Sequence, residues 1–169
     1  MKTEITINFD GSCAKNPNGA MGFGCMIESN NGILKHLHGG EEAKVGNTNN
    51  IAEYKAILLG LDYIIENNIQ DANISVYGDS NLVIQQLNGD WNIKIKPNSP
   101  KKGPLYAPYA FEAREKVIKI IKELGNKISF TWIPREENTK ADELSNIFHG
   151  GSAGTSNFDY KSFMKKNQF

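Results

Sequence analysis

The stretch that decides the fold is TEITINFD, at residues 3–10. Apolar and polar residues alternate through it, and a period of two is typical of a strand with one buried face. Turn-forming residues follow at 16–19, and two further strand-like stretches lie at 21–27 and 33–40. The sequence therefore predicts three antiparallel strands at the start of the chain.

From residue 47 the period of the apolar residues changes. They recur at steps of three and four residues, which indicates a helix that ends near residue 67. The elements predicted after it are a strand at 73–78, a helix at 80–87, a loop at 92–104, a helix at 111–124, a strand at 127–133 and a helix at 140–148. This order predicts an α/β fold, in which three antiparallel strands and then two parallel strands form one mixed five-stranded sheet flanked by helices.

Composition limits the class of protein. The 169 residues suit one domain, and their formal net charge is zero. No apolar run approaches the ~18 residues that a membrane span needs, and the N-terminus lacks the apolar stretch of a signal peptide. We therefore expect a cytoplasmic protein with no membrane partner. A glycine-rich stretch at 150–154 predicts a domain at 1–149 and a C-terminal extension at 150–169.

Basic residues and cysteines exclude some functions. Of the nineteen basic residues only Arg114 and Arg135 are arginines, and arginine is the side chain that reads guanine edges in a bidentate manner. This argues against sequence-specific DNA binding. Cys13 and Cys25 are too few for a disulfide framework and lack partners for a zinc site, so we expect both thiols to be structural.

Four acids lie where the predicted elements begin or end, and each has a structural explanation of its own. Asp10 precedes a glycine and could belong to a turn. Glu53 and Asp142 lie three residues after polar residues that could form capping boxes, and Asp79 directly precedes a helix that it could cap. Together, however, they fall at strand ends and helix starts that such a sheet brings to one place. The spacing of the apolar residues after Glu53 also places this acid on the buried stripe of its helix, where an ionised acid needs a partner such as a metal ion.

The motifs around these acids lie in a fixed order. They are FDGS at 9–12 with NP at 16–17 and GFG at 22–24, TNNIAE at 48–53, YGDS at 77–80, and WIPREEN at 132–138 leading into AD at 141–142. Over about residues 3–148 this series resembles the type 1 ribonuclease H family. The resemblance implies the ribonuclease H fold for residues 1–149, with Asp10, Glu53, Asp79 and Asp142 as the catalytic carboxylates.

The implied reaction is endonucleolytic hydrolysis of the RNA strand of an RNA/DNA hybrid, giving 5′-phosphate and 3′-hydroxyl ends. Two divalent ions ~3.5–4 Å apart stabilise the attacking and the leaving oxygen in such a reaction, and Mg²⁺ prefers hard oxygen ligands. The resemblance implies that Asp10, Glu53 and Asp79 coordinate metal and that Asp142 serves the second Mg²⁺ position, with Mn²⁺ able to substitute. We also expect raised carboxyl pKa values without metal, because the four acids repel one another.

Amide side chains beside the acids would contact the 2′-hydroxyl groups that distinguish RNA from DNA. The candidates are Asn16, Asn49, Asn50 and Asn81. Turn formation and helix capping are the structural alternatives, and they apply most to Asn50 and Asn81. Relatives often carry glutamine at the position of Asn81, so its contact would be shorter.

The DNA strand of the hybrid would lie against the predicted loop. Trp91, Lys94 and Lys96 are the candidate contacts, because a tryptophan among lysines can stack on bases and attract phosphates. The alternative is a solvated loop with Trp91 in the core. The tail at 158–169 interleaves lysines with aromatic residues, and we expect it to dock on the domain or to fray.

Many members of the family have a histidine in the loop before the fourth acid, whereas residues 132–142 contain none. His149 lies about two helical turns beyond Asp142, and this spacing predicts that it is too distant to replace the missing histidine. We expect Arg135 and the two glutamates that follow it to be solvated.

Two other functions remain open. The first is a hybrid-binding module with weak or no catalysis, although four acids would oppose phosphate binding. The second is another nuclease or a strand-transfer enzyme on the same fold, such as a 3′ to 5′ exonuclease or an integrase, but the motifs at 10–12 and 48–53 fit these poorly. We expect a monomer.

Overall fold

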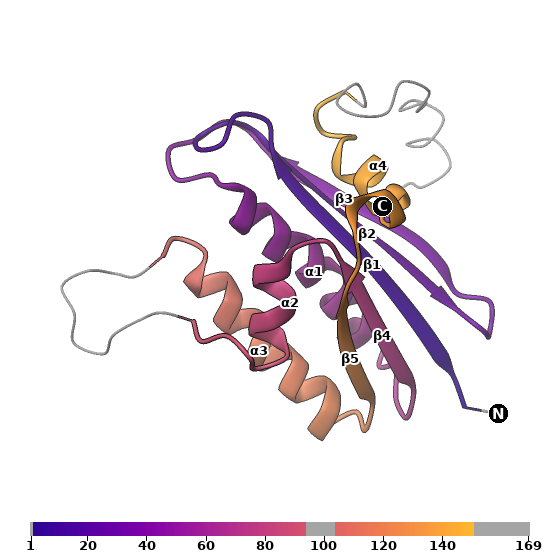
Figure 1. The fold of residues 1–169 in the computed structure, drawn as a ribbon. Coiled ribbons are helices and arrows are strands. Elements are labelled where there is room, and N and C mark those ends of the chain that lie inside the picture. Colours follow the sequence, from indigo (N-terminus) through magenta and orange to yellow (C-terminus); the bar gives the residue numbers. More distant parts are fainter. Residues whose placement is uncertain (1, 94–103, 151–169) are drawn as a thin grey trace.

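The computed structural model describes residues 2–93 and 104–150, and within them five strands form one sheet in the order β3-β2-β1-β4-β5 (Figure 1). The strands are β1 (Glu4–Cys13), β2 (Met21–Ser29), β3 (Leu34–Glu41), β4 (Asn73–Gly78) and β5 (Lys127–Trp132). The first three pair antiparallel, whereas β4 runs parallel to β1 and β5 parallel to β4. The predicted fold class is therefore confirmed.

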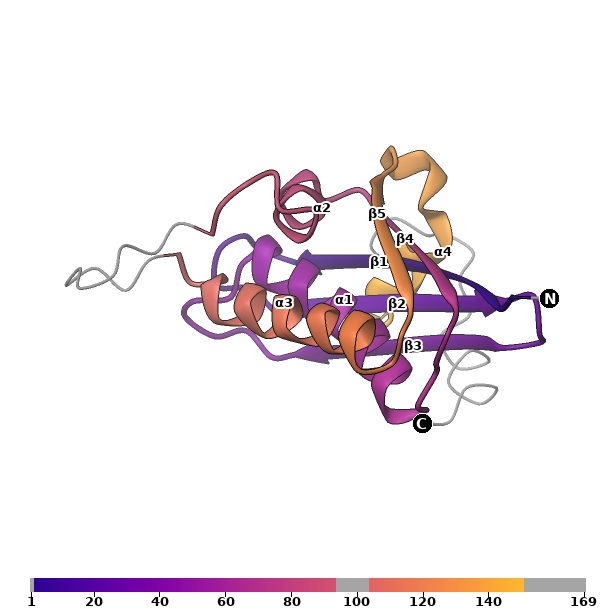
Figure 2. The same cartoon turned by 90° about the horizontal axis from the view of Figure 1, so that it is seen from below.

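Helices cover both faces of this sheet (Figures 1 and 2). They are α1 (Asn49–Glu66), α2 (Asn81–Leu87), α3 (Ala107–Lys122) and α4 (Thr139–Ser145), with a 3-10 turn η1 (Arg135–Glu137) before α4. A Cβ atom on Gly11 of β1 would lie 2.2 Å from the backbone of Ala52 in α1, whereas one on Gly24 of β2 would lie 2.4 Å from Leu144 in α4. Because Gly11 and Gly24 point to opposite faces, α1 and α4 lie on opposite sides of β1 and β2.

Strand β1 is the middle strand of the sheet, and its two faces carry different residues. Ile5, Ile7 and Phe9 are fully buried on the α1 face, and the even-numbered positions, including Asp10, point toward α4. Phe9 pairs with Gly78 of β4, and its ring occupies the space that a side chain at Gly78 would fill. This register places Asp10 and the residue after Gly78 next to each other at the carboxyl ends of parallel strands.

Most element boundaries differ by a few residues from those predicted, and three of the differences have a clear physical meaning. Strand β1 continues for three residues past Asp10, so this acid lies within a strand. Helix α1 begins at Asn49, and its N-cap is Thr48, whose Oγ1 accepts a hydrogen bond from Ile51 N at 3.2 Å. Helix α3 begins at Ala107 instead of 111, because the proline at 108 fits the first turn of a helix and does not end the loop.

Several predictions concern residues outside those that the structure describes. Lys94, Lys96 and the tail from 151 onward belong to this group, so the domain boundary near 150 stays a prediction. Both cysteines are buried and free, as expected of structural thiols. Among the described helices none is both long enough and apolar enough to cross a membrane.

Candidate active site

Three carboxylates from three separate elements meet at one end of the sheet. Ligand oxygens of Asp10 in β1, Glu53 in α1 and Asp79 after β4 all lie within 4.8 Å of one another. Asp142 of α4 lines the same cavity, which has a volume of about 220 Å³, but is not among the three that cluster. The structure thus brings together the four acids that the motifs single out.

The capping explanations for these acids are wrong. Helix α1 is capped by Thr48, and helix α2 is capped by Ser80, whose Oγ accepts from Val83 N at 3.3 Å. Helix α4 follows Asn138 and has no side-chain capping bond. Asp142 instead places its Oδ1 3.6 Å from Nη2 of Arg135. The acids therefore do not serve as the helix caps or the turn residue that local sequence allows.

The electrostatic state of the cluster follows from burial and mutual repulsion. Burial, with the neighbouring carboxylates of Asp79 and Asp142, raises the pKa of Asp10 to about 8. Burial, followed by the charges of Asp10 and Asp79, raises the pKa of Glu53 well above its ordinary value. Burial also raises the pKa of Asp79. The expected rise in carboxyl pKa values is confirmed for these three, and a bound cation would reverse it.

The donor set fits a hard divalent cation. Oε2 of Glu53 is buried and has no hydrogen-bond partner within the described part of the chain. A buried carboxylate oxygen without a partner is costly unless a cation or proton satisfies it. The clustered carboxylates of Asp10, Glu53 and Asp79 offer the oxygen ligands that Mg²⁺ and Mn²⁺ prefer. The residues present therefore fit the metal that the family resemblance implies.

Polar residues of α4 and of the positions that flank it support Asp10 and its strand, and no sequence motif marks them. Ser145 is fully buried, and its Oγ donates to the carbonyl of Asp142 at 2.8 Å and lies 3.4 Å from Asp10 Oδ2. Asn138 donates through Nδ2 to the carbonyl of Phe9 at 2.8 Å. Asn146 lines the cavity and donates to the carbonyl of Asp142 at 3.0 Å. The available signal was the run of polar residues on a helix that packs on the sheet.

Three of the predicted asparagines gather beside the acids. Asn16, Asn49 and Asn50 line a second cavity of about 500 Å³ together with Tyr106, and Asn49 also lines the acidic cavity. Oδ1 of Asn16 accepts from the backbone of Asn49 at 3.1 Å, and Oδ1 of Asn49 accepts from the backbone of Cys13 at 2.8 Å. Within the described residues no hydrogen bond uses the amide nitrogen of either side chain. These nitrogens can therefore donate to a ligand.

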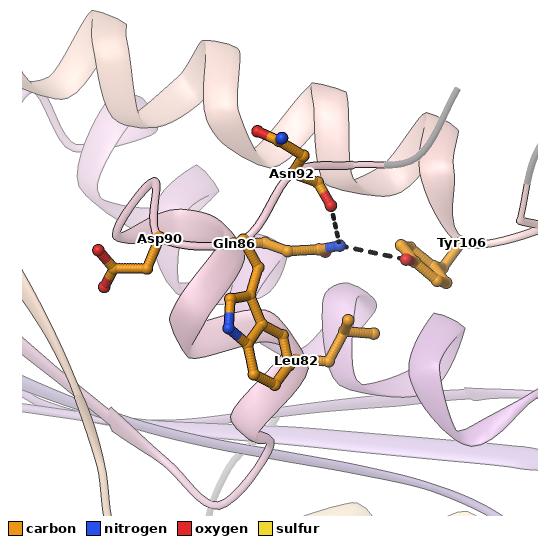
Figure 3. Close-up of a pocket in the computed structure, with 6 residues that line it drawn as sticks. Leu82, Gln86, Asp90, Asn92 and Tyr106 are labelled. Carbon is orange, nitrogen blue, oxygen red and sulfur yellow. Dashed lines mark hydrogen bonds between the residues drawn. The ribbon is translucent and has the colours of Figure 1, made fainter. Parts of the chain in front are cut away.

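Asn81 and Trp91 lie apart from this group. Asn81 is exposed on the first turn of α2, where its Oδ1 accepts from Gln85, and it does not line the acidic cavity. Trp91 is 44% exposed and lines a third cavity of about 530 Å³, whose lining also includes Tyr106 (Figure 3). The alternative that Trp91 faces the core is therefore wrong.

His149 lies closer to the site than its spacing suggests. The chain turns after α4 ends at Ser145, and Nε2 of His149 comes to 3.3 Å from Oγ of Ser12, which lines the acidic cavity. Burial lowers the pKa of His149. Arg135 is largely exposed, as expected, although it pairs with Asp142.

Comparisons with known proteins agree with this geometry. A family model described as reverse transcriptase-like matches residues 8–101. The bifunctional protein Rv2228c of Mycobacterium tuberculosis is 29% identical over 145 residues, which cover 85% of this chain and 35% of that protein. The chain thus spans about a third of the length of this relative.

Two solved structures are similar over most of their length. The N-terminal RNase H domain of Rv2228c from Mycobacterium tuberculosis, solved as a fusion with maltose binding protein, has a TM-score of 0.69 and 25% identity over 89% of this chain and 97% of that chain. LC11-RNase H1, solved in complex with an RNA/DNA hybrid, has a TM-score of 0.64 and 29% identity over 84% of this chain and 94% of that chain. Since the reverse transcriptase-like model matches more than half of the 169 residues and these structures are RNase H domains, the chain belongs to this family, the ribonuclease H family that its motifs resemble.

Proposed function

We propose that this protein is a ribonuclease H, an endonuclease that hydrolyses the RNA strand of RNA/DNA hybrids. The observation that carries the proposal is the cluster of Asp10, Glu53 and Asp79, whose ligand oxygens lie within 4.8 Å of one another, with Asp142 in the same cavity. The similarity to LC11-RNase H1, which was solved with a hybrid, supports the choice of substrate.

In this proposal the carboxylates are the metal ligands. Mg²⁺ ions bound by these carboxylates, or Mn²⁺ in their place, would supply an activated water and stabilise the leaving oxygen, and the products would carry 5′-phosphate and 3′-hydroxyl ends. Asp10, Glu53 and Asp79 would hold the first ion, and Asp142 would contribute to the position of the second. Ser145 and Asn138 fix Asp10 and its strand, which keeps the carboxylates oriented.

Substrate recognition is assigned to the neighbouring surfaces. The amide nitrogens of Asn16 and Asn49 donate to 2′-hydroxyl groups of the RNA strand, and Asn50 and Asn81 add contacts at the starts of their helices. Trp91 stacks on the DNA strand, whose phosphates Lys94 and Lys96 attract. A monomeric state and a cytoplasmic location stay predictions from the sequence.

One assay tests the proposal against its rivals. A uniformly labelled RNA/DNA hybrid, the two single strands and both homoduplexes are incubated with Mg²⁺ and either the wild type or Asp10→Asn. We expect internal cuts in RNA, in the hybrid alone, that the substitution abolishes. Degradation from an end would indicate an exonuclease, and binding of the hybrid without cleavage would indicate a binding module; either result would overturn the proposal.

A further inference from the structure

A buried glutamine joins the elements on either side of the substrate surfaces. Gln86 of α2 is 1% exposed. Its Oε1 accepts a hydrogen bond from the hydroxyl of Tyr54, and its Nε2 donates to the hydroxyl of Tyr106 at 3.1 Å and to the carbonyl of Asn92 at 3.3 Å (Figure 3). Both amide hydrogens and the amide oxygen are therefore in use, as a buried polar group requires.

The three partners come from different parts of the chain. Tyr54 is fully buried in α1. Tyr106, at the start of α3, stacks on it with ring centroids 5.9 Å apart and an interplanar angle of 15°. Asn92 directly follows Trp91. The side chain of Gln86 thus links the end of α2, the start of α3 and the residue after Trp91 to α1.

Tyr106 gives this network a relation to the substrate. It lines the cavity that holds Asn16, Asn49 and Asn50, and it also lines the cavity that holds Trp91. The surface assigned to the RNA strand and the surface assigned to the DNA strand therefore share a wall. Gln86 holds Tyr106 through the hydroxyl of that side chain, and it also holds the Trp91 cavity through the carbonyl of Asn92.

The anchoring of Trp91 is otherwise limited. The ring is 44% exposed, and its backbone nitrogen donates to the carbonyl of Gln85 at 3.2 Å. Ile93, two residues on, is buried. Without the amide of Gln86, the carbonyl of Asn92 between these two points would lose its hydrogen bond, and the Trp91 backbone would gain freedom.

We propose that Gln86 is a positioning residue that holds Trp91 and Tyr106 in the arrangement that receives the hybrid. This inference rests on the proposed ribonuclease H function, and it assigns Gln86 to substrate binding and not to bond cleavage. Gln86 does not line the acidic cavity, so its loss leaves the carboxylates in place.

Steady-state cleavage of the hybrid separates binding from chemistry. Gln86→Met keeps the length of the side chain and removes all three hydrogen bonds. We expect KM to rise about tenfold while kcat stays within about twofold, because loss of buried hydrogen bonds disorders a surface that binds ground state and transition state alike. Tyr106→Phe removes only the bond between Gln86 Nε2 and the tyrosine hydroxyl, and it tests the same inference if Gln86→Met does not fold. For this variant we expect KM to rise about threefold.

The matched control is Asn88→Ala in the same helix segment. Asn88 donates through Nδ2 to the carbonyl of Phe130 at 3.0 Å, so it ties α2 to β5 and not to Trp91. It is expected to lower thermal stability without changing KM. If Asn88→Ala and the Gln86 and Tyr106 variants raise KM equally at equal loss of stability, Gln86 has only a structural role and the inference is overturned.

Fluorescence provides a second readout that does not need activity. The chain has two tryptophans, Trp91 and Trp132, so Trp132→Phe leaves Trp91 as the only indole. In that background we expect Gln86→Met to lower the emission anisotropy of Trp91. If both the anisotropy and KM stayed unchanged, the inference about Gln86 would be overturned, whereas the proposed function would stand. If the wild type fails to cleave the hybrid, the proposed function falls and takes the substrate role of Gln86 with it, whereas a fall in anisotropy would still show that Gln86 anchors Trp91.

Discussion

The acidic cavity and the Gln86 network both bury polar groups, but they do so with opposite results. In the network every polar atom of Gln86 has a partner, and Tyr54 and Tyr106 stack beside it. In the acidic cavity Oε2 of Glu53 has no partner among the described residues, and burial raises the pKa of three carboxyls. The first arrangement stabilises one conformation, whereas the second is unfavourable until a cation binds.

The strongest test of this contrast is Glu53→Gln, which keeps the shape of the side chain and removes its charge. We expect hybrid cleavage to fall about a thousandfold, which corresponds to several kcal/mol of lost metal-dependent stabilisation. The control is Glu143→Gln in α4, whose carboxylate lies 3.6 Å from Lys140 and does not line the acidic cavity. Cleavage at the wild-type rate by Glu53→Gln would contradict the assigned site.

The second test is the pH dependence of folding stability in EDTA. The pKa of Asp10 rises from 3.8 to about 8 on folding, so its proton binds the folded state more tightly. Stability is therefore greatest below pH 4 for this group and is lost as the pH rises toward 8. We expect Asp10→Asn to be about 2–4 kcal/mol more stable than the wild type at pH 8, with the difference vanishing near pH 4. Urea titrations at both pH values measure this difference in the free energy of unfolding. If the wild type instead became more stable relative to Asp10→Asn as the pH rises, the raised pKa of Asp10 would be refuted.

Addition of metal should reverse that loss. At pH 8, Mg²⁺ at one hundred times its Kd should stabilise the wild type by about 2.7 kcal/mol, because the cation binds the folded state alone. Asp10→Asn should gain much less, and Gln86→Met should gain as much as the wild type. Thermal unfolding with and without Mg²⁺ decides between these outcomes. An equal gain in Asp10→Asn would place the cation elsewhere.

A smaller loss of stability is expected when Asn138, which holds the strand of Asp10, is replaced. Asn138→Ala removes the bond to the Phe9 carbonyl and should lower stability by about 1–2 kcal/mol, because that acceptor is buried. Asn30→Ala is the matched control, since Asn30 bridges to Lys2 and Glu4 at the exposed end of the sheet. A loss in the control as large as in Asn138→Ala would show that burial does not decide the effect.

Local pattern accounts for most of the fold. The period-two stretch of β1 and the helical repeat of α1 predicted these two elements, because each pattern lies within a single element. The succession of strands and helices along the chain predicted a mixed sheet, but the spatial order of the strands came from the structure. The start of α3 was placed too late, since a proline is compatible with both a loop and the first turn of a helix. The polar residues at 47–50 marked the start of α1 but did not show which of them caps it, because several polar residues in a row can all cap.

The site was predictable only where motifs mark it. The four acids stand in recognisable motifs, but Ser145 and Asn138 reach β1 from 135 and 129 residues away and follow no local pattern. Gln86 is similar, because its neighbour Gln85 is the same residue type and only the packing shows which of the two is buried. Contacts between distant segments depend on the tertiary structure, and one sequence does not display them.

Gly11 shows how closely the strand and the helix depend on each other. Its missing side chain lets β1 touch the peptide that joins Ala52 to Glu53, since a Cβ there would lie 2.2 Å from Ala52 and 2.5 Å from the nitrogen of Glu53. Even a single methyl group at this position would push α1 outward and carry its glutamate away from its neighbours. The proposed cleavage would thus be lost with every acid intact, because the spacing of the carboxylates depends on the absence of a Cβ atom at residue 11.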